Sequence, residues 1–79
     1  MQIWQPTDSV KLRQLRLEQG LDVFVVAQKC SISLRQMQEL EGEGEGAFYS
    51  AAIKYQVGLK VLRALGDSIE SVPQGQESR

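Results

Sequence analysis

Histidine is absent from this chain of 79 residues, and cysteine occurs once, at Cys30. The absence of histidine removes the most common general base, the most common metal ligand and any Ser-His or Cys-His nucleophile pair. A single cysteine excludes an intrachain disulfide and a zinc site built from several cysteines. An enzyme would have to rely on carboxylates or lysine, so we expect no catalysis, no cofactor and no metal.

Long apolar stretches are also lacking. The longest unbroken apolar run, residues 23–27, is far shorter than the ~20 residues that a membrane span needs. Residues 1–6 have neither the basic start nor the apolar centre of a secretion signal. A lone thiol without an export signal leads us to expect a cytoplasmic protein with no membrane partner. No small-molecule ligand is indicated.

A strong positive charge is missing as well, because the formal net charge is −1. Most small DNA-binding domains are basic, since their affinity for DNA comes largely from neutralising phosphates. The overall charge therefore does not favour a nucleic-acid partner.

A helical pattern of apolar residues runs through the chain. Candidate residues for the helix starts are Thr7, Asp8 or Ser9, then Asp22, then Ser31 or Ser33, and finally Phe48 or Ser50. The four helical segments end at about residues 19, 30, 41 and 65, and residues 67–70 add one short turn. We divide the chain into an N-terminal extension (1–8), a helical domain (9–72) and a flexible polar tail (73–79).

The last long helical segment is apolar around more than half of its circumference. At about 100° per residue, one sector of this helix holds Ile53, Val57, Val61, Ala64 and Leu65. Tyr55, Leu59 and Leu62 widen this sector beyond what a one-sided helix requires. Two interpretations follow. Either this is a central helix packed by several others, or Tyr55, Leu59 and Leu62 contact a second subunit or a partner.

Four short motifs occur in order along the chain. They are Leu12-Arg13-x-x-Arg16-x-x-x-Gly20-Leu21, Val26-Ala27-Gln28-Lys29, Met37-x-x-Leu40-Glu41 and Ala64-Leu65-Gly66. Together they resemble the phage-repressor (XRE-type, lambda repressor-like) helix-turn-helix domain over roughly residues 9–70, and most of all its RodZ-like bacterial branch. The resemblance implies a compact all-α fold of four to five helices, with the helix-turn-helix at the second and third.

The same resemblance implies two structural roles. Arg16 would reach across to Glu41 in a largely buried ion pair, whereas the simpler interpretation is two surface charges on separate helices. Cys30 would be a buried structural thiol rather than a redox sensor.

The resemblance also implies that the third helix enters the major groove of DNA. The matching base-contact candidates are Ser33, Leu34, Arg35, Gln36 and Glu39, and the phosphate-contact candidates are Lys11, Arg13 and Lys29. Arg35 and Gln36 suit guanine and adenine. Three departures weaken this interpretation. Val23 replaces a glutamine that holds a phosphate in the phage repressors, Leu34 and Glu39 occupy base-facing positions, and further carboxylates follow Glu39.

Apolar residues at outer positions point instead to a protein partner. Leu17, Phe24 and Val25, together with Leu34, would form an exposed apolar patch, which in a soluble monomer usually marks an interaction site. Alternatively, Ile3 and Trp4 fold back over some of these residues.

Two functions therefore compete. The first is a DNA-binding transcriptional regulator, dimeric because one helix reads few bases. The second is a protein-interaction module, an adaptor or anti-regulator, that keeps the fold without DNA binding. RodZ-like domains dock onto a cytoskeletal filament protein, although this chain lacks their basic juxtamembrane stretch and membrane span. The first is preferred because most members of this fold are regulators.

Overall fold

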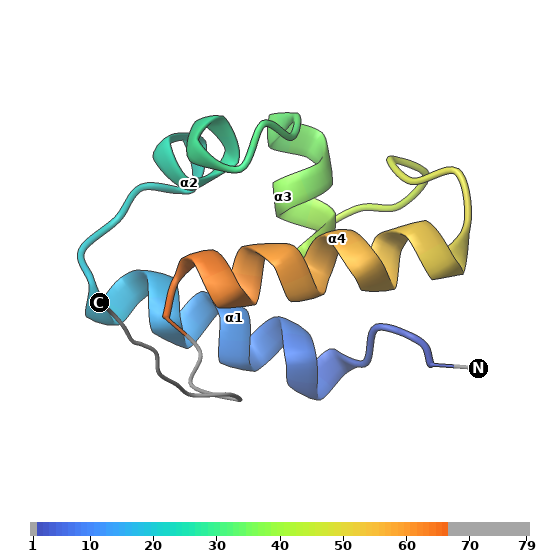
Figure 1. Cartoon of the computed structure of the whole chain (residues 1–79), viewed down its shortest axis with the longest axis horizontal. Coiled ribbons are helices and arrows are strands. Elements are labelled where there is room, and N and C mark those ends of the chain that lie inside the picture. Colours follow the sequence, from blue (N-terminus) through green and yellow to red (C-terminus); the bar gives the residue numbers. More distant parts are fainter. Residues whose placement is uncertain (1, 67–79) are drawn as a thin grey trace, which may run out of the picture.

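The computed structural model describes residues 2–66 as four α-helices with no strand. The helices are α1 (Pro6–Glu18), α2 (Val23–Lys29), α3 (Leu34–Leu40) and α4 (Ala51–Ala64) (Figure 1). Helices α2 and α3 pack against each other, and α1 packs against α4. The all-helical class expected from the sequence is confirmed for this part of the chain. Residues 67–79, with the expected short turn and polar tail, lie outside it.

The start of α1 differs from the sequence-based expectation of Thr7, Asp8 or Ser9. The helix begins at Pro6, with Gln5 as its N-cap, and the Asp8 carboxylate accepts a 2.8 Å hydrogen bond from the backbone N–H of Gln5. Proline suits the first helical position because its missing N–H would have no intrahelical partner there and its φ is already helical. Asp8 thus belongs to the first turn of α1.

Short polar residues begin both central helices. The Asp22 carboxylate accepts from Phe24 N at 2.9 Å, and Ser33 Oγ accepts from Gln36 N at 3.0 Å. Only residues 30–33 link α2 to α3. Ser31 adopts a left-handed backbone conformation (φ 59°) in this link, where the chain leaves α2 and turns sharply.

The long final helix follows an irregular glycine-rich loop. Ser50 caps α4 by accepting from Ile53 N at 3.2 Å. The helix ends at Ala64, one residue before the expected end. Its apolar arc is only partly buried. Val61 and Leu65 lie in the core, whereas Ile53 is 43% exposed.

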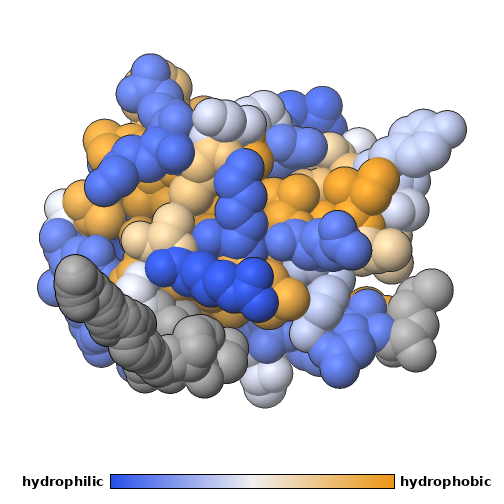
Figure 2. All heavy atoms as spheres, in the orientation of Figure 1, coloured by the Kyte–Doolittle hydropathy of each residue, from blue (hydrophilic) through white to orange (hydrophobic). Residues whose placement is uncertain are grey.

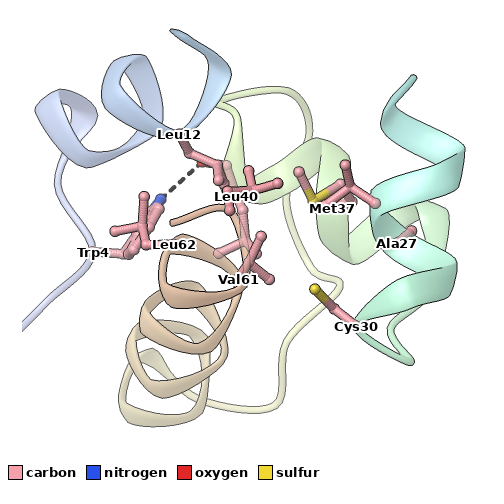
Figure 3. Packing of buried hydrophobic residues seen from close by; sticks show 10 residues of the cluster. Trp4, Leu12, Ala27, Cys30, Met37, Leu40, Val61 and Leu62 are labelled. Carbon is pink, nitrogen blue, oxygen red and sulfur yellow. Dashed lines mark hydrogen bonds between the residues drawn. The ribbon is translucent and has the colours of Figure 1, made fainter. Parts of the chain in front are cut away.

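Side chains from all four helices meet in one core (Figure 3). Its completely buried members are Leu12, Met37, Leu40, Val26 and Val61. Ala27 is also buried, where α2 meets α3, and Cys30 lies beneath the end of α2. No helix within residues 2–66 is long and apolar enough to cross a membrane.

Trp4 completes this core from the N-terminal segment. Its indole Nε1 donates to the carbonyl of Leu40 at 2.8 Å (Figure 3). The same N–H donates to Ser9 Oγ at 3.1 Å. Its ring lies against Gly58 of α4, where an added Cβ would come within 2.2 Å of a ring carbon. The segment set apart as an extension (1–8) therefore supplies a core side chain and the first turn of α1.

The position of Trp4 contradicts two expectations from the sequence. Trp4 packs on α4 and not over the apolar residues of α2, so the proposed cover for Phe24 and Val25 is wrong. Leu62 is 2% exposed within the core that includes Trp4, so its assignment as a partner-contacting residue is also wrong. The wide apolar arc of α4 is needed in part because the N-terminal segment packs against it.

Candidate interaction surface

Arg16 and Glu41 join α1 to the end of α3. Arg16 Nε and Nη2 donate to the two Glu41 oxygens at 2.6 and 2.9 Å, and Nη1 donates to the Leu21 carbonyl at 2.9 Å. The two side chains are 14% and 5% exposed. Hydrogen bonding to Glu41 raises the pKa of Arg16. This bidentate pair fixes α1 against α3, so both side chains are structural.

Glu39, one of the base-contact candidates, is buried in the structure. Its carboxylate accepts from the backbone N–H of Ala47 at 2.8 Å and pairs with Lys54 Nζ at 3.1 Å. Burial alone would raise the pKa of Glu39, but the hydrogen bond from Ala47 and the contact with Lys54 together lower it. Glu39 is 7% exposed. Its assignment as a base contact is wrong, because it holds the loop and α4 against α3.

Gln36 and Ser33 are also held by the fold. Gln36 Oε1 accepts from Ser33 N at 3.2 Å, and its Nε2 donates to the Ala47 carbonyl at 3.3 Å. Ser33 Oγ caps the same helix. A glutamine reads adenine with both its oxygen and its nitrogen, and here both atoms have partners within the chain. Reading a base would require breaking the contacts that order the start of α3.

Leu34 and Arg35 are the base-contact candidates whose side chains remain exposed without such contacts. Leu34 is apolar, so it offers a base only van der Waals contact. The phosphate candidates are on different helices. Lys11 and Arg13 belong to α1, where Arg13 lies 3.8 Å from the Glu43 carboxylate, and Lys29 ends α2.

Exposed apolar side chains are a clearer feature of this surface. Phe24 is 52% exposed and Val25 40%, both on α2, and Leu34 at the start of α3 is 38% exposed. Figure 2 shows apolar atoms at the surface over α2. Leu17, on α1, is 59% exposed. These four residues lie where the sequence predicts them, at outer positions of their helices.

Other exposed apolar residues do not follow from the sequence pattern. Tyr49 is 96% exposed in the loop before α4, and Ile53 follows it one turn into the helix. Tyr49 stands directly before the capping residue Ser50, outside the helical pattern, and that position is the only sequence signal of its exposure. Tyr55 and Leu59 are half-buried, and the Tyr55 hydroxyl donates to Gln2 of the N-terminal segment. Much of their surface is therefore already used within the chain.

Cys30 is buried at the end of α2. Burial raises the pKa of its thiol, and this outweighs the opposite effect of Lys60 and Lys29 nearby. A buried, protonated thiol is a poor nucleophile. Among residues 2–66, no three potential metal-binding side chains from His, Cys, Asp and Glu lie together.

Comparison with protein-family models, with curated proteins and with solved structures finds no match for this chain. Functional inference therefore rests on the surface itself.

Proposed function

We propose that this domain is a protein-interaction module in which α2 and α3 form a helix-turn-helix pair, and that its binding surface includes Phe24, Val25 and Leu34. The observation that carries the proposal is the exposure of these three side chains on neighbouring helices. Apolar side chains at the centre of an interface, surrounded by polar ones, are typical of protein recognition sites.

The polar side chains of α3 support the same conclusion. Gln36 and Glu39, which would face bases in a DNA complex, make hydrogen bonds that hold the loop at Ala47. A DNA reader needs such groups free, because sequence is read by hydrogen bonds to base edges. Here the exposed remainder of α3 is one leucine and one arginine.

DNA binding is the second candidate, and one observation favours it. Arg35 is exposed in the first turn of α3, the position from which a recognition helix contacts bases, and Lys29 is exposed at the end of α2. Binding of this kind would depend strongly on salt, because each neutralised phosphate releases counterions.

A matched pair of variants tests the proposal. Phe24→Ser removes the most exposed apolar side chain of α2, and Gln28→Ser changes an exposed polar residue one turn later. Both should keep the helical circular-dichroism spectrum and the unfolding midpoint. We expect a protein cross-linked to the wild-type domain in its source cells to be retained by Gln28→Ser and lost by Phe24→Ser.

Titration with a mixed-sequence DNA duplex completes this test. We expect no binding at low ionic strength, measured by fluorescence anisotropy. Tight binding that weakens steeply with salt and is relaxed by Arg35→Ala would instead establish the DNA-binding candidate.

A further inference from the structure

The nearly neutral net charge conceals an uneven distribution of charge. Neither residues 23–38 nor residues 46–66 contain an aspartate or glutamate. The carboxylates of residues 2–66 lie instead on α1, at Asp22, at the end of α3 and in the glycine-rich loop. Helices α2 and α4 therefore carry only positive charges, whereas the acidic groups are concentrated elsewhere.

Lys29 of α2 and Lys60 of α4 directly precede Cys30 and Val61, which belong to the same buried core cluster. Both lysines also lie near enough to the Cys30 thiol to act on it electrostatically. Both are exposed, and neither forms a salt bridge with any residue in the range 2–66. Arg13, Arg16 and Lys54, in contrast, each contact a carboxylate. Two cations from different helices are thus available to an external anion.

Apolar side chains accompany these two lysines along each helix. Val25 lies one turn before Lys29 on α2, and Ile53 and Val57 precede Lys60 at intervals of four and three residues on α4. Such intervals place side chains on one face of a helix. Val25 is 40% and Ile53 43% exposed. We call these five residues, Val25, Lys29, Ile53, Val57 and Lys60, the α2–α4 surface.

Figure 2 shows the face that contains α2 and α4, with apolar atoms interspersed with hydrophilic side chains. A surface of this composition matches an amphipathic partner segment in which apolar residues are flanked by carboxylates. The apolar side chains would be buried against Val25 and Ile53, and the carboxylates would meet Lys29 and Lys60.

We infer that the α2–α4 surface binds an acidic, amphipathic helical segment of a partner protein. This inference rests on the proposed function and specifies the chemistry of the partner. A duplex is the less favourable occupant, because its charged backbone would cover the exposed Val25 and Ile53 without burying them against apolar groups. In addition, the two lysines lie on α2 and α4 and not at the start of α3.

Three labelled probes test the inference by fluorescence anisotropy with the full chain. The first is a synthetic amphipathic helical peptide with leucines on one face and glutamates beside them. The second has glutamine at each glutamate position, and the third is a mixed-sequence duplex. We expect the acidic peptide to bind at least tenfold more tightly than the glutamine peptide, with an affinity that falls as salt rises.

Charge-reversal variants locate the site. Lys29→Glu combined with Lys60→Glu should weaken binding of the acidic peptide by roughly a hundredfold, since each opposite charge at an interface contributes about tenfold or more. Arg35→Glu combined with Lys11→Glu makes the same change in net charge outside this surface, and we expect it to weaken binding less than threefold. Circular dichroism checks that both variants remain folded.

The outcomes separate the inference from the proposed function. Equal binding of both peptides would overturn the acidic-partner inference and leave a protein-interaction module. An equal effect of the two charge-reversal variants on binding of the acidic peptide would also overturn the inference. Binding of the duplex alone would overturn both the inference and the proposed function. Failure of all three probes to bind would count against the acidic segment as the partner.

Discussion

The packing of Trp4 against Gly58 leads to a quantitative prediction for the substitution of Gly58 by alanine. Replacing glycine by alanine inside an exposed helix stabilises a protein by about 1 kcal/mol, because alanine loses less backbone entropy. At Gly58, however, the new Cβ would lie 2.2, 2.4 and 2.7 Å from three carbon atoms of the Trp4 ring. Carbon atoms in contact are separated by about 3.5–4.0 Å. The ring therefore has to move by roughly 1 Å or more.

Movement of the Trp4 ring costs free energy because hydrogen bonds hold its indole nitrogen in place. The indole N–H donates to the Leu40 carbonyl at 2.8 Å and to Ser9 Oγ at 3.1 Å. Loss of a buried hydrogen bond costs about 1 kcal/mol, and overpacking a core adds about 1–3 kcal/mol. Against a helix-propensity gain of about 1 kcal/mol, Gly58→Ala should destabilise the domain by roughly 1–3 kcal/mol.

Urea unfolding followed by far-UV circular dichroism measures this change, and fluorescence of Trp4, the only tryptophan, reports its environment. We expect a lower unfolding midpoint together with red-shifted emission. In a Trp4→Ala background the sign should reverse, so that Gly58→Ala becomes stabilising by about 1 kcal/mol. A stabilising effect of Gly58→Ala in the wild-type background would refute the described packing of Trp4 on α4.

Three further predictions concern the ion pairs and one turn. Glu41→Gln should destabilise the domain by about 3 kcal/mol, because Arg16 keeps a largely buried charge without its partner. Urea unfolding measures this effect, and Glu43→Gln, at an exposed carboxylate, should change stability by less than about 0.5 kcal/mol. Ser31→Gly should raise stability by up to about 1 kcal/mol, because glycine adopts the left-handed conformation at Ser31 without strain; a lower unfolding midpoint would contradict this. The pKa of Glu39 is lowered in the folded state. Its carboxylate therefore stabilises the domain above about pH 4.3, the ordinary pKa of glutamate. That contribution is lost as the pH falls below this value. Glu39→Gln should thus flatten the stability curve on the acidic side, and an unchanged acid dependence would argue against the contacts of Glu39.

The helix ends are the part of the fold that local sequence determines best. Asp22 and Ser33 each cap the helix that follows them, as their short polar side chains predict. Gly20, just after the end of α1, has a positive φ of 66°, a conformation that glycine adopts at little cost. These features depend on neighbours within a few residues, so one segment suffices to predict them.

Contacts between distant segments are harder to foresee. The packing of Trp4 on Gly58 joins residues far apart in the chain, and nothing in the pattern around Trp4 indicates which helix it contacts. Glu39 is similar. Its place on α3 suggests an outward side chain, but the loop brings the Ala47 N–H and Lys54 to it. The tertiary arrangement decides whether such a carboxylate is a surface group or an internal anchor.

The most direct test of the interaction surface is a residue-by-residue map of binding by ¹H–¹⁵N NMR. The folded chain would be titrated with the acidic amphipathic peptide and, separately, with a mixed-sequence duplex. A protein-interaction module whose binding surface includes Phe24 and extends over the α2–α4 surface predicts that the peptide shifts the backbone signals of Phe24, Val25, Lys29 and Lys60. The duplex should leave the spectrum unchanged. Shifts at Leu34 and Arg35 on addition of the duplex, with no response of α2 and α4 to the peptide, would contradict it.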